Sequence, residues 1–255
     1  MAPGAVTEVT AVTSLMAAPD ITADCRVASI TEIYANASTF PCKVITEAGN
    51  PWVMKLRGSG PGPMALLTEF LALRAARSMG LIVPDVRPIY LPQNFPWTIG
   101  TDEFDGIIQR SYGWNLGVGF IDQAQPATPE AIFSGDPVFL QALFDVDRAL
   151  SNMDRTTRNP NVLATQAGLI AIDFDACLFL RRAAQGIVPS AFPLPAGHLC
   201  SDRAIPAPLR KLDPQVVLDA LREAPAEWLA ISQLEIGALA AKLLTYIAAW
   251  NAQEV

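Results

Sequence analysis

The order of apolar and polar positions divides the chain into a strand-rich first part and a helical second part. Short β-compatible runs occupy residues 27–34, 43–46 and 52–56 and are separated by turn residues. Runs at 86–91 and 106–109 complete the expected strands, and a helix is expected over residues 64–79, before Gly80. This pattern predicts an antiparallel meander with one helix.

The second half contains helical patterns around one polar loop. Asp136 and Pro137 supply an N-cap and a first-turn proline for a helix through Leu150. A polar loop over 151–161 is followed by a hairpin of strands 162–165 and 169–172. From Pro214 onward the pattern is helical again. Strands first and helices later indicate an α+β chain with two lobes.

We therefore expect a loosely ordered tail at 1–24, a small lobe at 25–110 and a large helical lobe at 111–255. The tail lacks the basic start of a secretory signal. The most apolar window, 236–250, contains Lys242 and is shorter than the about 20 apolar residues that a membrane span needs. Its apolar residues recur at helical spacing, which predicts a helix packed on a core and not in a membrane.

Composition removes several classes of function. The net charge of −7 argues against a protein that mainly binds nucleic acid, because that affinity comes from basic side chains. Four scattered cysteines form no Cys-x-x-Cys pair, and His198 is the single histidine, so a histidine-rich metal site is excluded. Free thiols in a reducing compartment are expected, which favours the cytoplasm.

Nucleotide motifs of other folds are absent from the sequence. Pro61 and Pro63 remove backbone donors from the glycine- and proline-rich segment at 58–63, which argues against a dinucleotide site. The chain has no Gly-x-x-x-x-Gly-Lys-Ser/Thr motif and no Gly-x-Ser-x-Gly elbow. Walker-type nucleotide sites and serine hydrolases of the elbow type are therefore disfavoured.

Oxygen ligands gather around the polar loop. Asp154 and Asn159 are separated by four residues within it, and Asp173 stands at the exit of the expected hairpin. Phosphoryl transfer needs a carboxylate to orient and deprotonate a hydroxyl and oxygen atoms to hold magnesium. This order of residues is the one that a protein-kinase-like site uses.

The first half of the chain contains a lysine and a glutamate that can form an ion pair. Lys55 lies on the expected strand at 52–56, where an amine can reach nucleotide phosphates. Glu69 lies on the next helix, and its neighbours three and four residues away are all apolar. Because such a carboxylate needs a partner from elsewhere, Lys55 is the candidate.

These motifs, 152–161 with 172–173, 53–55 and 68–70, resemble the HipA-like kinases, a branch of the protein-kinase-like superfamily. The resemblance covers roughly residues 30–180 and implies a two-lobed kinase fold that uses ATP and Mg²⁺ and transfers the γ-phosphate to a hydroxyl. It makes Asp154 the catalytic base, Asn159 and Asp173 the magnesium ligands, and Lys55 the phosphate-contacting lysine with Glu69 as its partner. Serine or threonine hydroxyls of a protein are the implied acceptor.

The resemblance also assigns residues that meet the nucleotide. Gln109 and Arg110 would end at the hinge near adenine, and Ser38 and Thr39 would contact phosphates from a loop that contains no glycine. Asp175 stands where the wider superfamily has glycine. Two interpretations are open: Asp175 is an additional magnesium ligand, or it only takes the place of the glycine. Asn161 supports the loop or is an extra ligand.

Two alternatives stay open at the level of sequence. The glycine-free loop and Asp175 suit a pseudokinase that acts as a binding or regulatory module, and related folds phosphorylate small molecules. Several charged residues also have structural explanations. Asp145 and Asp147 are interpreted as structural or solvated, His198 as a surface or packing residue, and Arg155 and Arg158 as phosphate contacts or salt-bridge partners.

Overall fold

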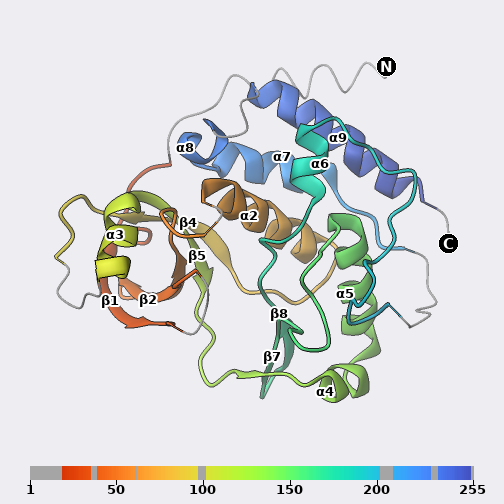
Figure 1. The fold of residues 1–255 in the computed structure, drawn as a ribbon, viewed down its shortest axis with the longest axis horizontal. Coiled ribbons are helices and arrows are strands. Elements are labelled where there is room, and N and C mark those ends of the chain that lie inside the picture. Colours follow the sequence, from red (N-terminus) through yellow and green to blue (C-terminus); the bar gives the residue numbers. More distant parts are fainter. Residues whose placement is uncertain are drawn as a thin grey trace.

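The computed structural model describes residues 19–35, 39–60, 62–96, 102–201, 209–230 and 235–253. The tail expected at 1–24 lies outside these residues up to position 18. A sheet with its own short helix forms one end of the molecule, and most of the helices form the other (Figure 1). This arrangement confirms the expected α+β class with a strand-rich and a helical part.

The sheet contains five antiparallel strands in the order β1-β2-β3-β5-β4. The strands expected at 27–34, 43–46, 52–56 and 86–91 are confirmed within one or two residues. The last strand, 113–119, was not expected. The bounds are β1 (Val27–Ile33), β2 (Cys42–Thr46), β3 (Pro51–Lys55), β4 (Val86–Leu91) and β5 (Gly113–Gly119).

The strand expected at 106–109 is wrong, because these residues belong to helix α3 (Asp102–Arg110). Phe104, Ile107 and Ile108 recur at helical spacing and are all buried in one core cluster. A window of four residues shows only the β-branched pair and misses this period. The sheet instead continues through β5 to Gly119, past residue 110, where the small lobe was expected to end.

The two faces of the sheet are covered differently. Alternate residues Cys42, Val44 and Met54 are buried in the core cluster that includes α3. On the opposite face of β3, Val53 packs against the core cluster that includes helix α2 (Pro63–Ser78) and the large lobe. Side chains on this face, Lys43 and Lys55 among them, are only partly buried. The face of β2 and β3 toward the large lobe is therefore less completely covered than the opposite face.

The second half forms a helical body with one hairpin. Asp136 caps its helix by accepting a hydrogen bond from the N–H of Val138 at 2.8 Å, as expected. The hairpin around residue 166 is also confirmed. The elements are β6 (Gln125–Pro126), α4 (Pro129–Ser134), α5 (Pro137–Leu150), β7 (Val162–Thr165), β8 (Gly168–Ala171), α6 (Phe179–Ala184), α7 (Pro214–Glu223), α8 (Ala226–Leu229) and α9 (Ile236–Asn251).

Helix α9 is packed on the large core, as its apolar spacing predicts. Leu239, Leu243, Tyr246, Ile247 and Trp250 are all buried there. Within the described ranges, no helix combines the length and the apolar character needed to cross a membrane. Helix α2 packs against α5, α7 and α8 as well as the sheet, so the helix that carries Glu69 joins the two lobes.

Candidate active site

Lys55 and Glu69 meet across the interface between β3 and α2. Nζ of Lys55 lies 2.5 Å from Oε2 of Glu69, whose side chain is 1% exposed. Lys55 sits at the end of β3, and Glu69 faces inward from the second turn of α2, so the strand and the following helix bring them together. The contact expected from the apolar surroundings of Glu69 is present.

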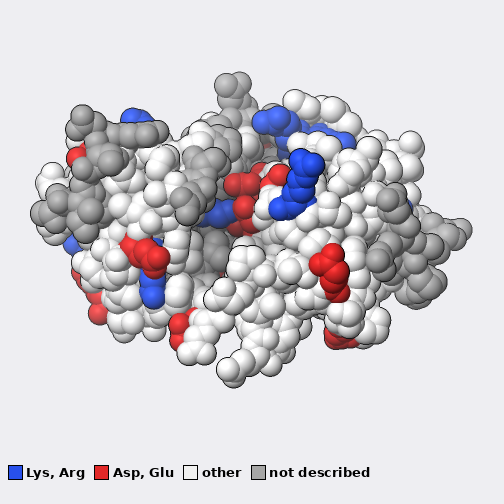
Figure 2. Space-filling view, turned by 60° about the horizontal axis from the view of Figure 1, so that its bottom comes forward, with Lys and Arg blue, Asp and Glu red and all other residues white. Residues whose placement is uncertain are grey.

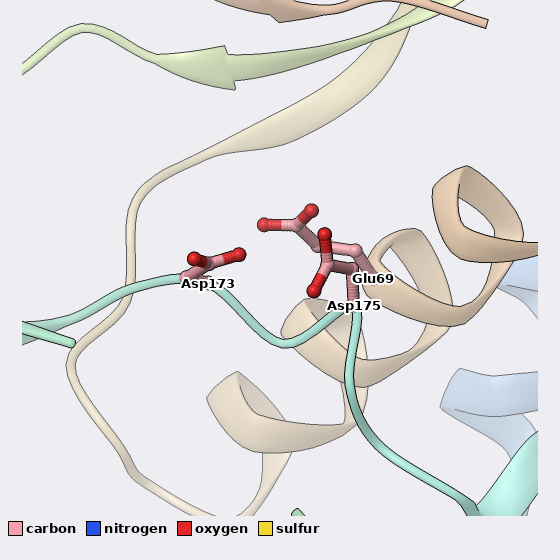
Figure 3. Close-up of side chains that lie close together, drawn as sticks. All are labelled: Glu69, Asp173 and Asp175. Atoms are coloured by element: carbon pink, nitrogen blue, oxygen red, sulfur yellow. The ribbon is translucent and has the colours of Figure 1, made fainter. Parts of the chain in front are cut away.

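Two further carboxylates join this pair from the segment after β8. Nζ of Lys55 donates to Oδ1 of Asp173 at 2.6 Å and lies 3.7 Å from Oδ2 of Asp175. Figure 3 shows the carboxylates of Glu69, Asp173 and Asp175 turned toward one another, and one oxygen of each lies within 4.8 Å of the others. Asp175 is therefore part of this carboxylate cluster.

The cluster holds more negative than positive charge. Burial raises the pKa of Glu69 to about 7, and Asp173 and Asp175 add to the increase against the opposing effect of Lys55. Burial by itself lowers the pKa of Lys55, but the surrounding carboxylates outweigh it and raise the pKa. Burial raises the pKa of Asp175 as well, and Lys55 opposes this effect. A divalent cation beside these oxygens would relieve the repulsion.

Asp154 and Asn159 face each other across the polar loop. Nδ2 of Asn159 donates to Oδ2 of Asp154 at 2.7 Å, and Nδ2 of Asn161 reaches the same oxygen at 3.4 Å. Asp154 and Asn159 are exposed. Asn161 and Asp173 have positive φ angles of 48° and 62°, a strained conformation that concentrates at functional sites. The loop thus presents a carboxylate to solvent, with two amide side chains on it.

Acidic and basic side chains appear together in a hollow near the centre of the face drawn in Figure 2. Asp173 and Asp175 are partly exposed, with side-chain exposures of 36% and 27%, whereas Lys55 is 15% exposed. The field of Asp154 also acts on Asp175, which places the loop carboxylate close to the cluster. The sequence-predicted groups Lys55, Glu69, Asp154 and Asp173 therefore gather in one region.

The loop between β1 and β2 is described at Thr39, whereas Ser38 lies outside the described residues. Thr39 is next to the segment that joins β3 to α2: a Cβ atom at Gly60 would lie only 2.8 Å from Cγ2 of Thr39. Gly60 also has a φ of 51°, so this close approach depends on glycine. No contact of Thr39 with the charged cluster is present among the described residues.

The structure does not place Gln109 and Arg110 at a hinge. Both are exposed at the end of α3, and the Arg110 guanidinium donates to the carbonyl of Gly58 at 3.3 Å. The chain leaves the sheet only after Gly119. There, residues 121–123 and the β7–β8 hairpin line a cavity of about 430 Å³. The assignment of Gln109 and Arg110 rested on a strand at 106–109 and loses its basis.

Three buried charged or titratable residues have structural contacts that sequence reasoning described only in part. The side chains of Asp147, Arg155 and His198 are fully buried, and Arg155 and His198 both contact the Asp147 carboxylate. Arg155 is thus a salt-bridge partner, and His198 is not on the surface. A signal was available for Asp147, because its helix neighbours Leu143 and Leu150 are apolar, the same argument that singled out Glu69.

Comparisons with known proteins support the fold. No family model matches the chain, and no curated protein matches it by sequence. A solved structure of the Helicobacter pylori proinflammatory kinase CtkA matches with a TM-score of 0.51 and 13% identity, covering 90% of this chain and 93% of that one. An aminoglycoside phosphotransferase from Alicyclobacillus acidocaldarius matches at 14% identity over 92% of this chain and 96% of that one, but its TM-score of 0.29 is too low to support an argument. The chain has a protein-kinase-like fold.

Proposed function

We propose that this protein is an ATP- and Mg²⁺-dependent phosphotransferase that moves the γ-phosphate of ATP to a hydroxyl. The observation that carries the proposal is the meeting of Lys55 with Glu69, Asp173 and Asp175 beside a loop that presents Asp154. The residues come from β3, α2, the loop after α5 and the segment after β8. The kinase-like fold gives this set of groups a matching framework.

Each side chain has a role that its position supports. Asp154 orients the acceptor hydroxyl and takes its proton as the oxygen attacks the γ-phosphorus and the bond to the β-phosphate oxygen breaks. Asn159 and Asn161 hold the Asp154 carboxylate through amide N–H groups. Lys55 contacts the nucleotide phosphates, and Glu69 keeps its amine in place.

The residues present fit a magnesium ion. Three carboxylates share one lysine. Both oxygens of Glu69 are buried and have no hydrogen bond among the described residues. Oε2 forms an ion pair with Lys55, so Oε1 is the oxygen left without a charged partner. Asp173 and Asp175 are the carboxylates partly open to solvent, and with Asn159 they would hold the ion. Magnesium, when bound, neutralises charge that develops on the phosphate oxygens.

We place the nucleotide on the partly covered face of β2 and β3, because Lys55 lies on that face. Its phosphates would approach Lys55, and Ser38 and Thr39 stay the sequence-based candidates for further phosphate contacts. The connection after β5 takes the place that Gln109 and Arg110 had in the sequence-based assignment. Residues 121–123 beside the cavity of about 430 Å³ are the candidates for contacts with the base.

A protein serine or threonine is the acceptor that we propose, within a HipA-like kinase that acts in the cytoplasm. Met153 is 45% exposed, and Asp154, Arg158 and Asn159 are exposed with it. An open loop of this kind suits an extended peptide better than a small sugar, which an enclosed acidic pocket would hold. A small-molecule kinase is the alternative that an acceptor screen separates.

One observation favours a second function, a pseudokinase that serves as a binding or regulatory module. Lys55 is engaged by all three carboxylates of the cluster, and nucleotide phosphates must compete with them for its amine. If the carboxylates hold the lysine too firmly, the fold binds partners without transferring phosphate.

The test is a comparison of nucleotide binding and phosphate transfer in matched variants. The native chain, Asp154→Asn and Asp173→Ala are assayed with Mg²⁺ and γ-labelled ATP for self-phosphorylation and for labelling of peptides and aminoglycosides. Asp219→Asn, an exposed carboxylate on α7, is the control and retains native activity. We expect both site variants to lose transfer and Asp154→Asn to keep ATP binding. Binding without any transfer supports the module, and no binding at all refutes the site.

A further inference from the structure

A buried carboxylate in α5 lies at the centre of a hydrogen-bond network beneath the polar loop. Oδ2 of Asp147 accepts from Nε of Arg155 at 2.6 Å, and Oδ1 accepts from Nδ2 of Asn152 at 2.9 Å. Nε2 of His198 lies 3.0 Å from Oδ2 of the same carboxylate. Burial alone would raise the pKa of Asp147, but Arg155 and His198 outweigh it and lower the pKa.

This network makes hydrogen bonds to the polar loop on both sides of Asp154. Asn152 precedes Asp154, and its Oδ1 accepts the Asp154 N–H at 3.2 Å. Arg155 follows it, and its Nη1 donates to the carbonyls of Pro160 and Asn161 at 2.8 and 2.7 Å. The start and the end of the loop are therefore tied to one buried ion pair.

Arg155 also connects the loop to the acidic cluster. Its guanidinium lies 4.9 Å from the ring centroid of Phe174, and both side chains are fully buried. Phe174 stands between Asp173 and Asp175 in the chain. A displacement of Arg155 would thus disturb the loop that presents Asp154 and the segment that carries two of the cluster carboxylates.

His198 reaches the network from a segment distant in sequence, 51 residues after Asp147. Its backbone pairs with Thr156 as an isolated bridge, and the N–H of Leu199 donates to the Arg155 carbonyl at 2.9 Å. Nδ1 of His198 accepts the N–H of Cys200 at 3.0 Å. Because an accepting nitrogen carries no proton, the single proton of the neutral ring lies on Nε2 and points to Asp147.

We propose that His198 is a positioning residue for phosphate transfer, which acts through Asp147 and Arg155 on the loop that carries Asp154. The catalytic part of this inference rests on the proposed function, because it requires that the protein transfers phosphate. His198 touches neither Asp154 nor the carboxylates of the cluster among the described contacts. Its Nε2–H holds the Asp147 carboxylate in the orientation that receives Arg155, and its backbone holds the segment 198–200 against the loop.

The tautomer gives the first test, because the chain has a single histidine. Long-range ¹H–¹⁵N spectra of the full chain at neutral pH report which ring nitrogen carries the proton, without any assignment between residues. We expect the Nε2–H pattern, unaffected by exchange with a second form. An Nδ1–H pattern, or the averaged signals of a free imidazole, would overturn the network.

The second test replaces the ring in two ways. In His198→Gln the amide nitrogen can donate in place of Nε2–H, whereas His198→Leu removes the donor. We expect His198→Leu to lower kcat by about 10- to 100-fold, the loss typical when an outer partner of a functional ligand is removed. KM for ATP should stay within about twofold, since His198 does not contact the nucleotide face, and His198→Gln should restore most of kcat.

The control is Trp228→Phe, which removes a buried indole N–H bonded to the Trp114 carbonyl at 3.1 Å in a different part of the core. It should lower the melting temperature and leave kcat unchanged. If kcat of the His198 variants only follows the loss of melting temperature, or if both variants match the native rate, His198 is not a positioning residue.

Hydrogen exchange keeps the two proposals separable. In His198→Leu, and not in His198→Gln, the amides of residues 152–161 should exchange faster, whether or not the native chain transfers phosphate. Unchanged exchange in both variants refutes the positioning role by itself. Faster exchange in a chain that shows no transfer refutes the proposed function and leaves the clamp on the loop intact.

Discussion

Two groups of charged side chains, each with a buried carboxylate, lie close to the polar loop, and their charges are balanced differently. In the Asp147 network one carboxylate meets one guanidinium, and both of its oxygens accept hydrogen bonds. In the Lys55 cluster one amine meets three carboxylates, and Glu69 retains a buried oxygen with no hydrogen bond among the described residues.

The difference separates a structural role from a chemical one. A charge-balanced pair can stay in the interior because its desolvation is offset by its own contacts. Both oxygens of Asp147 accept hydrogen bonds, and Nη2 of Arg155 is the one guanidinium nitrogen without a hydrogen bond among the described residues. An unbalanced cluster keeps repulsion that a bound cation or the protonation of a carboxylate relieves. The pKa of Glu69 is raised to about 7, whereas that of Asp147 is lowered, although both carboxylates are buried. Unequal charge, and not burial alone, marks the candidate active site.

The largest expected effect comes from unbalancing the structural network. Arg155→Met leaves Asp147 buried without its countercharge, which typically costs about 3–5 kcal/mol of unfolding free energy. Denaturant unfolding followed by far-UV circular dichroism measures the loss. The control is Arg77→Met, whose exposed pair with Asp85 should contribute at most about 1 kcal/mol. Equal losses in the two variants would contradict the contrast between the regions.

The second expected effect is a loss of catalytic rate when the Lys55 cluster is changed, and it corresponds to a smaller change in free energy. Lys55→Met removes the amine that we propose contacts the nucleotide phosphates, and the loss of one such group commonly lowers kcat by about 100- to 1,000-fold. Transfer of γ-phosphate at saturating Mg²⁺ and ATP measures it. Lys242→Met is the matched control, because that amine donates to the Ala184 carbonyl on the helical body. A native rate in Lys55→Met would remove Lys55 from the site.

The expected effect that is smallest per unit step is a dependence of stability on pH. The pKa of Glu69 is about 7 in the folded chain against an ordinary value of 4.5, so the folded state holds this proton more tightly. Its contribution to stability is therefore complete below about pH 4.5 and is lost as the pH rises through about 7. Over this window the unfolding free energy should fall by up to about 1.4 kcal/mol per pH unit because of this group.

The variant Glu69→Gln removes that contribution. Unfolding curves of the native chain and of the variant, measured from pH 4 to 8, should converge in slope above pH 7 and differ below it. Glu47→Gln, in an exposed pair with Arg26, should keep the native slope. Parallel curves for the native chain and Glu69→Gln would show that Glu69 titrates in its ordinary range.

The sequence predicted the parts of the fold that depend on interactions between residues close together in the chain. The cap at Asp136, the hairpin around residue 166 and the apolar stripe of α9 each depend on residues within a few positions of one another, and each is present. The strand β5 escaped prediction because its glycines disfavour an isolated strand. Gly117 is required by packing, since a Cβ atom there would lie 2.3 Å from Cγ1 of Ile89 on the neighbouring strand.

The sequence by itself determined the identity of the candidate site residues and their order along the chain: Lys55, Glu69, Asp154, Asn159 and Asp173. Only the tertiary structure decided that Asp175 joins this cluster and that His198 clamps the polar loop through Asp147. The physical reason is that Coulomb energy and desolvation depend on distances and burial between residues far apart in the chain. Spacing along the sequence reports neither quantity.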